Sequence, residues 1–290
     1  MNGHVHYFTI FTKEFENIAN FGLKTFKQFN NVLLNVYVLD NSDPVLDYEN
    51  INIIRYAPKL KLDEFNDKYI SKKAINCAIQ SLDIIKQDFE IFVRIDLDAI
   101  FFCNIEELVE YSVIHKIGFL GAKDYWSENK EYFHKPYYLN CGIAVFNKKY
   151  FNLKTDFQMF YNPEIHFCPE QDYLNTIENK KPYPGSICLS ALYLSNLDSL
   201  DNLKIIHLNG FFTKPFKKIP IFSELLFVFI DLICFLGKNS VFENIFEENK
   251  KFLNSEFKKL QINKKVKLLK AKRGQNWKKL FVSGSVIETI

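Results

Sequence analysis

The sequence contains few glycines and no glycine-rich loop of the kind that holds phosphates. Only 10 of its 290 residues are glycine, and residues 11–15, at the end of the first predicted strand and just beyond it, contain none. An enzyme that synthesises sugar nucleotides would need such a loop, because closely spaced glycines let backbone N–H groups approach the phosphates. The absence argues against a sugar nucleotidyltransferase.

Closely spaced cysteines are absent as well. Six cysteines are scattered along the chain, with no Cys-x-x-Cys pair among them. This pattern is typical of reduced core residues in a cytosolic protein and does not suit a disulfide framework or a zinc site. The first residues also lack the basic stretch and apolar core of a signal peptide. We therefore expect a cytoplasmic protein.

The sequence has no hydrophobic run suited to crossing a membrane. Residues 221–237 come closest, but as a helix these 17 residues would reach only about 26 Å. Glu224 and Asp231 lie within the run, and each would cost about 2.5 to 3.5 kcal/mol near a bilayer centre. A helix packed on the folded domain, or a helix pair lying at the membrane interface, fits this segment better.

The sequence does contain enough apolar material for one large domain. Hydrophobic residues make up 48% of the chain and charged residues 24%, as in ordinary globular proteins. Residues 250–280 hold twelve Lys or Arg and one acid, a net charge of +11, whereas the whole chain carries +3 and the remainder therefore about −8. We expect a folded domain over residues 1–220 and a helical, basic region over residues 221–290.

The basic region predicts attachment to an anionic membrane surface, on the cytoplasmic face of an inner membrane. Near such a surface each basic residue contributes about 1 kcal/mol, so a few contacts are enough for peripheral binding. A solvated basic helix is the alternative. Nucleic-acid binding is not expected, because residues 250–280 lack the interleaved aromatic side chains that stack on bases.

The first part of the chain alternates between strand and helix patterns. Strands are expected at residues 5–12, 33–39, 51–56, 91–98 and 118–122, and helices at residues 17–28, 71–86 and 104–114. This alternation predicts right-handed βαβ units, and hence an α/β fold with a single Rossmann-like, mostly parallel sheet flanked by helices.

The most informative stretch is residues 91–98, an apolar run that ends in Asp96 and Asp98. Its β-branched and aromatic residues predict a central strand that is buried on both faces. Ligands of open α/β sheets gather at the carboxyl ends of strands, and residues two apart on a strand point the same way. The two carboxylates would therefore converge on a divalent cation. A solvated strand end that carries two aspartates is the alternative.

Residues 138–147 form another strand-like run, and it contains Asn140 and Gly142. A glycine inside a strand indicates that some other group approaches the backbone closely, here beside the donor and acceptor of an asparagine side chain. A β-bulge with a capping asparagine explains the same residues.

Two shorter stretches follow. Residues 170–172, Glu-Gln-Asp, open a helical run, which also suits an acidic helix start stabilised by the helix dipole. His207 ends a short apolar strand. A lone histidine is more often structural, but beside two aspartates a neutral imidazole is a ligand that Mn²⁺ accepts more readily than Mg²⁺.

Taken in order, these four stretches resemble the motifs of the family 8 glycosyltransferases, the glycogenin and bacterial lipooligosaccharide galactosyltransferase group. The family's Asp-x-Asp is matched by Asp96 and Asp98, and its Asn-x-Gly by Asn140 and Gly142. Its Asp-Gln-Asp is matched, with one change, by residues 170–172. Its His-x-x-Gly-x-x-Lys-Pro-Trp is matched by His207, Gly210, Lys214, Pro215 and Phe216. The resemblance covers about residues 5–216 and implies the A-type glycosyltransferase fold.

The sequence departs from the family's pattern at three points. Three residues separate Gly210 from Lys214 where the family usually has two, which changes the reach of Lys214 toward a donor phosphate. Phe216 replaces the usual Trp and keeps an aromatic surface. Glu170 replaces Asp, and we assign it no catalytic role.

The resemblance implies a retaining hexosyltransferase that uses a nucleotide-diphosphate sugar, most often a UDP-sugar, with Mn²⁺ or Mg²⁺ as cofactor. The implied metal ligands are Asp96, Asp98 and His207. The implied donor contacts, besides the two aspartates, are Ile10, Thr12, Lys73, Gly142, Gly210 and Lys214. The residues implied at the transferred sugar are Asn140, Gln171 and Asp172.

The same resemblance implies a glycan or glycolipid acceptor, as in the synthesis of bacterial surface lipooligosaccharide or polysaccharide. Two alternatives remain open at this stage. Lys73 also suits a solvated position on the helix that precedes the central strand. The whole chain also suits a catalytically inactive adaptor that binds membrane or glycan, although the presence of both aspartates and His207 favours an enzyme.

Overall fold

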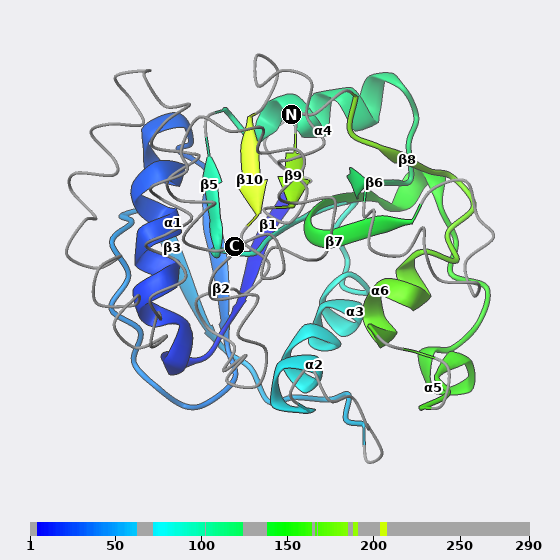
Figure 1. Cartoon of the computed structure of the whole chain (residues 1–290), viewed down its shortest axis with the longest axis horizontal. Helices are drawn as coiled ribbons and strands as arrows, with labels where there is room; N and C mark the ends of the chain where they lie inside the picture. The colour runs from blue at the N-terminus through cyan, green and yellow to red at the C-terminus, as the bar shows by residue number, and fades with distance from the viewer. Residues whose placement is uncertain are drawn as a thin grey trace, which may run out of the picture. The chain divides into compact units, whose positions relative to one another are not determined.

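The computed structural model describes residues 5–62, 72–101, 103–123, 138–163, 166, 168–184, 188–190 and 204–207 (Figure 1). All of them belong to one compact unit, formed by Met1–Ser190 and Leu200–His207. Among these residues, no helix has the length and apolar character needed to span a bilayer. The expected boundary at residue 220, the apolar run at residues 221–237 and the basic region lie outside the described part of the chain.

A seven-stranded sheet forms the centre of this unit. Its order is β3-β2-β1-β4-β7-β6-β8. The strands are β1 (Val5–Phe11), β2 (Leu34–Val38), β3 (Ile51–Arg55), β4 (Ile91–Ile95), β6 (Phe119–Lys123), β7 (Leu139–Asn147) and β8 (Lys180–Pro182). Only the two ladders that involve β7 are antiparallel; the other four are parallel. The predicted mostly parallel sheet with a central, fully buried β4 is therefore confirmed.

A second, three-stranded sheet was not predicted. It contains β5 (Ala99–Phe101), β9 (Cys188–Ser190) and β10 (Ile205–His207), in the order β5-β10-β9. β5 begins four residues after β4 ends, so a short connection leads from the large sheet to the small one. This connection carries Asp96 and Asp98. We expected the two aspartates to lie on one strand, but both lie beyond the end of β4.

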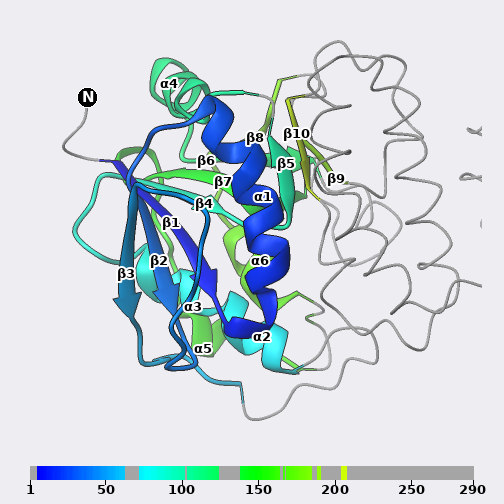
Figure 2. The ribbon, with the colours of Figure 1, turned by 90° about the vertical axis from the view of Figure 1, so that its left-hand side faces the viewer.

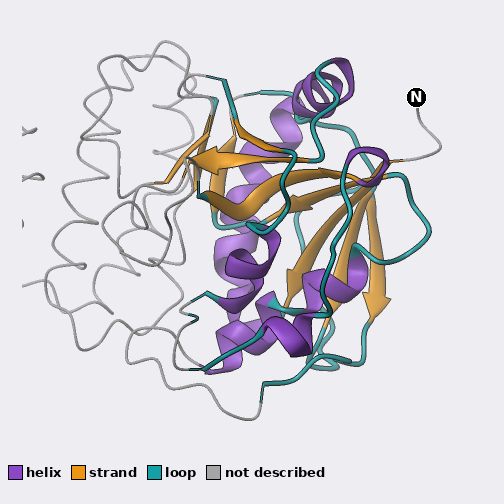
Figure 3. Cartoon of the chain, turned by 90° about the vertical axis from the view of Figure 1, so that its right-hand side faces the viewer, coloured by secondary structure: helices purple, strands orange, loops and turns teal. Residues whose placement is uncertain are grey.

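Helices cover both faces of the large sheet. They are α1 (Glu16–Phe29), α2 (Lys72–Ala78), α3 (Gln80–Ile84), α4 (Glu106–Ile114), α5 (Phe157–Phe160) and α6 (Pro169–Leu174), with short 3₁₀ turns η1 (Lys13–Phe15) and η3 (Lys148–Tyr150). Side chains of α1 and α4 pack in one apolar cluster with Val36 and Val93, whereas those of α2, α3 and α6 pack in the other with Phe8 and Phe92. Figure 2 views the molecule from the side on which α1 lies, and Figure 3 views it from the opposite side.

The single helix expected over residues 71–86 was wrong, because the helix ends at Ala78 and resumes at Gln80. The buried Gln80 amide donates to the carbonyl oxygens of Asn76 (2.7 Å) and Leu60 (2.6 Å). A side chain that takes the carbonyl four residues earlier competes with the helical hydrogen bond at that position. Through its bond to Leu60, Gln80 also connects the loop before residue 62 to α2 and α3.

Helix α1 holds the segment that follows β4. Thr25 accepts a hydrogen bond from the backbone N–H of Phe101 (3.0 Å), and Asn30 accepts one from Ile105 (2.7 Å) and donates to the carbonyl of Cys103 (3.1 Å). Gly22 lies against the backbone of Leu97, with so little room that an added Cβ would lie 2.9 Å from its carbonyl carbon. The connection between β4 and β5 is therefore fixed by α1 from one side.

Candidate active site

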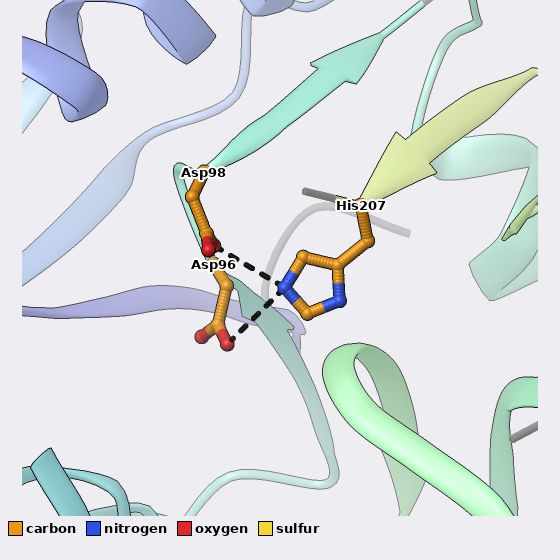
Figure 4. Close-up of side chains that lie close together, drawn as sticks. All are labelled: Asp96, Asp98 and His207. Carbon is orange, nitrogen blue, oxygen red and sulfur yellow. Dashed lines mark hydrogen bonds and ion pairs between the residues drawn. The ribbon is translucent and has the colours of Figure 1, made fainter. Parts of the chain in front are cut away.

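Asp96, Asp98 and His207 form a compact group at the carboxyl end of β4 (Figure 4). Nε2 of His207 lies 3.2 Å from a carboxylate oxygen of Asp98 and 3.8 Å from one of Asp96. One ligand atom from each residue lies within 4.8 Å of the others. The side chains of Asp96 and Asp98 are 27% and 17% exposed, so a ligand from solvent can reach the group.

Strand pairing explains why a residue more than 100 positions away joins the two aspartates. β10 runs antiparallel to β5 and places His207 opposite Ala99, the residue after Asp98. On the other side, β7 runs antiparallel to β4 and its ladder continues past the strand, because the Asp96 N–H donates to the carbonyl of Gly142 (2.7 Å). The structure therefore brings together the three side chains named from two separate stretches, and two sheets assemble the group.

Gly142 provides the space that the His207 ring occupies. A Cβ at this position would overlap Cε1 of His207 and lie 2.8 Å from both ring nitrogens. The sequence left two interpretations open here, a close approach of another group and a β-bulge with a capping asparagine, and the structure shows both. The approaching group is the imidazole, and the pairing of β6 with β7 shifts register between Gly121 and Ala122, opposite this stretch. Any side chain larger than hydrogen at position 142 would have to displace His207 or the strand.

Asn140 supports His207 from the side opposite the aspartates. Its Oδ1 accepts a hydrogen bond from the N–H of Gly142 (2.9 Å) and lies 3.2 Å from Nδ1 of His207. If Nδ1 carries the proton and donates it to this oxygen, the lone pair of Nε2 faces the carboxylates. A hydrogen bond of this kind fixes the tautomer and ring orientation of metal-binding histidines.

The electrostatics of the group favour a positive charge. Burial by itself lowers the pKa of His207, but the negative charges of Asp98 and Asp96 outweigh it and raise the pKa of His207 above its ordinary value. A cation between the three side chains would satisfy the same attraction. Two carboxylates and an imidazole are also a donor set that suits Mn²⁺, so the residues fit the metal that the sequence implied.

A buried arginine connects this group to α6. Arg94 contacts both carboxylate oxygens of Asp96, through Nε (3.0 Å) and Nη2 (3.3 Å), and its Nη1 lies 3.4 Å from Oε1 of Glu170. Burial would lower the pKa of Arg94, but the carboxylates of Asp96 and Glu170 raise it well above its ordinary value. The Arg94 guanidinium thus lies between the carboxylates of Asp96 and Glu170.

All six residues of α6 are buried, including its two acids. Oε1 of Gln171 accepts a hydrogen bond from the N–H of Cys141 (3.2 Å), and Asp172 accepts one from the hydroxyl of Tyr138. Asn175, just after the helix, accepts from the N–H of Leu139 (2.8 Å) and donates to its carbonyl (2.8 Å). The two acids do lie in the first turn of α6, as the alternative of an acidic helix start has it, and the helix is an interior element fixed to β7.

The structure places the other predicted donor contacts as follows. β1 runs parallel to β4 with Phe8 opposite Arg94, so Ile10 and Thr12 lie further along at the edge where Asp96 stands. Ile10 is half-buried and Thr12 is buried, and the Thr12 hydroxyl has no hydrogen-bond partner among the described residues. Lys73 lies in α2, but its side chain, like Gly210 and Lys214, is outside the part of the chain described.

Sequence reasoning missed Arg94 and Tyr138, and it assigned no role to Glu170. The first of these could have been found, because an arginine inside a strand that is buried on both faces must have anionic partners nearby. Glu170 carries no such signal, because its burial in α6 and its position beside Arg94 arise only in the fold. Tyr138 carries no sequence pattern that points to its role.

No family model and no curated protein matches this sequence. Solved structures do match. A structure of the galactosyltransferase LgtC in complex with donor and acceptor sugar analogs aligns with a TM-score of 0.56 at 15% identity, over 71% of this chain and 87% of that chain. An active-site mutant of LgtC aligns with a TM-score of 0.52 at 13% identity, over 76% and 95% of the two chains. At this identity the likeness establishes the fold, which is the A-type glycosyltransferase fold that we predicted.

Proposed function

We propose that the chain is a glycosyltransferase that moves a sugar from a nucleotide-diphosphate sugar to a glycan or glycolipid acceptor. The observation that carries the proposal is the Asp96, Asp98 and His207 group at the carboxyl edge of this fold. LgtC, which shares the fold, was solved with donor and acceptor sugar analogs bound. The resemblance to family 8 adds the finer terms of the proposal, namely a UDP-sugar donor, Mn²⁺, retention of configuration and a role in bacterial surface glycan synthesis.

The geometry suits the chemistry of this reaction. The bond to be broken joins the anomeric carbon of the sugar to the diphosphate, and negative charge builds on the departing oxygen. A divalent cation held by Asp96, Asp98 and His207 would stabilise that charge without a proton transfer. Lys214, as an additional positive charge at the diphosphate, belongs to the same proposal.

The residues around the group have defined tasks in this proposal. Asn140 keeps His207 oriented through Oδ1, while its amide nitrogen makes no hydrogen bond within the described residues and can donate to a sugar hydroxyl. Gln171 and Asp172 are held by Cys141 and Tyr138, so their positions are set before a ligand arrives. Preorganised polar groups of this kind act on the transition state without the cost of reorganisation. Ile10 and Thr12 would contact the nucleoside at the adjacent strand.

A donor screen tests the proposal. We expect Mn²⁺-dependent release of UDP from at least one UDP-hexose, no release above background in EDTA, and a rate at least about 100-fold lower for Asp98→Asn. The estimate is a lower bound, because changes that only touch the partners of metal ligands already cost 10- to 100-fold. Release of UDP can be followed by a coupled assay.

Asp88→Asn is the matched control, because Asp88 is an exposed acid in the loop before β4 and should leave the rate unchanged. If the wild-type protein turned over no nucleotide sugar under any condition, the proposal would be wrong, and the interpretation as an inactive adaptor would replace it.

The basic segment at residues 250–280 carries a separate proposal of peripheral attachment to anionic lipid. Its net charge of +11 is the reason, since each basic residue near an anionic surface contributes about 1 kcal/mol. We expect the full-length protein to co-sediment with vesicles that contain phosphatidylserine at low salt, and a variant ending near Asn249 to stay in the supernatant. Equal recovery of both proteins would remove the proposal.

A further inference from the structure

Arg94 occupies an unusual position in this fold. It lies inside the central strand β4, its side chain is only 7% exposed, and it contacts two carboxylates and one hydroxyl. A buried charge of this kind is tolerated only when its partners compensate for the lost water. Among the described residues its partners are Asp96, which is part of the candidate metal site, Glu170 on α6 and Ser81 on α3.

The contact with Asp96 involves the two carboxylate oxygens at once. Nε of Arg94 donates to Oδ1 (3.0 Å) and Nη2 donates to Oδ2 (3.3 Å). This two-point contact fixes the plane of the carboxylate as well as its position. Each oxygen keeps one lone pair, and Oδ2 is the atom that lies 3.8 Å from Nε2 of His207. Arg94 therefore determines how Asp96 is presented to His207 and Asp98.

We propose that Arg94 is a positioning residue that fixes the orientation of Asp96 for cation binding and joins this carboxylate to α6 through Glu170. The inference rests on the proposed function and adds to it a residue that is not one of the motif residues, although it lies in the stretch of residues 91–98 that carries Asp96 and Asp98. It also explains Glu170, which is one methylene longer than the aspartate usual at this place in the family. The longer side chain reaches Arg94, and its Oε1 lies 3.4 Å from Nη1.

The inference separates geometry from charge, and two variants test that separation. Arg94→Lys keeps the positive charge but cannot make the two-point contact, because an ammonium is a point charge on a flexible stem. Arg94→Met combined with Glu170→Gln removes one charge of each sign, so the net charge of the region is unchanged. We expect both variants to bind Mn²⁺ about 10- to 100-fold more weakly than the wild type, the range typical for partners of metal ligands.

The measurement is the affinity for Mn²⁺ alone, from the electron paramagnetic resonance signal of free Mn²⁺, together with the urea midpoint of each variant. Arg94→Met alone leaves Glu170 buried without this partner, which should lower the stability. The double variant, Arg94→Met with Glu170→Gln, should recover part of the stability that Arg94→Met loses. It should not recover the affinity for Mn²⁺. Ser112→Ala is the control for loss of a buried hydrogen bond. The hydroxyl of Ser112, in α4, donates to the carbonyl of Ile117 (2.8 Å). This variant should keep the affinity for Mn²⁺ within about twofold.

Wild-type affinity for Mn²⁺ in both Arg94→Lys and the double variant would overturn the inference. So would a double variant that recovers its affinity for Mn²⁺ together with its stability, because Arg94 would then have a structural role only. A wild-type protein that binds no Mn²⁺ would overturn it as well. Failure of the proposed function is a different result: it is the absence of nucleotide-sugar turnover in a protein that does bind Mn²⁺ and whose Arg94 variants bind it weakly.

Discussion

Gly142→Ala is expected to remove the cation site while most of the domain stays folded. The added Cβ would overlap the His207 ring, which is buried and belongs to β10, so the ring cannot swing into solvent. Either His207 or the strand carrying residue 142 must move. We expect the affinity for Mn²⁺ to fall at least about 100-fold, because a ligand is displaced outright, and the free energy of unfolding to fall by about 1–3 kcal/mol, the usual cost of overpacking.

Gly118→Ala is the matched control for this variant. Its Cβ would also be crowded, at 2.7 Å from the carbonyl oxygen of Tyr150 and 2.8 Å from Cβ of Phe151, but none of its three nearest atoms belongs to the cation group. It should lose stability and keep its affinity for Mn²⁺. Adding His207→Ala to Gly142→Ala should restore stability, since the overlap disappears, but not cation binding. Wild-type affinity in Gly142→Ala would show that His207 is no ligand.

Gly22→Ala is expected to cause the largest loss of stability of any substitution considered for this protein. The Cβ would overlap the carbonyl oxygen of Leu97 and lie 2.9 Å from its carbonyl carbon and 3.1 Å from the carbonyl oxygen of Ala99, all of them backbone atoms. Alanine gains about 1 kcal/mol over glycine in a helix interior. Overpacking costs about 1–3 kcal/mol and occasionally more, and here α1 cannot withdraw, because Leu23 and Phe26 are fully buried in the core.

Because the overlap is with backbone atoms, we take the overpacking cost as about 4 kcal/mol, above the usual range. After the helix gain of about 1 kcal/mol, the net effect of Gly22→Ala should be a loss of about 3 kcal/mol in the free energy of unfolding, measured by urea denaturation. Cation affinity should fall with it, because Leu97 stands between Asp96 and Asp98. Gln28→Ala, an exposed position on the same helix, should change stability by no more than about 0.5 kcal/mol. A Gly22→Ala protein more stable than the wild type would mean that α1 is not in close contact with the β4–β5 connection.

Much of the site could be predicted because its chemistry is local in sequence. Asp96 and Asp98 follow a buried strand, and the carboxyl ends of central strands are where ligands bind in such sheets. Gly142 stood out because glycine weakens a strand unless something needs its space. His207 was expected as the third ligand only because the two aspartates had already been proposed.

What could not be predicted depends on long-range pairing. The register between β5 and β10, which brings His207 to Asp98, joins segments more than 100 residues apart. The argument that Asp96 and Asp98 converge because they share a strand was wrong in detail, since the strand ends at Ile95 and a turn orients them instead. The burial of α6 was also unexpected, because three consecutive polar residues suit a solvated helix start as well as an interior one.

Calorimetric titration of UDP into the protein, in Mn²⁺ and again in EDTA, tests the central claim most directly. The claim is that Asp96, Asp98 and His207 hold a divalent cation that in turn holds the diphosphate of a donor. The account predicts binding of UDP in Mn²⁺, none in EDTA, and none in either condition for Asp98→Asn. Equal binding of UDP in Mn²⁺ and in EDTA, or full binding by Asp98→Asn, would contradict it.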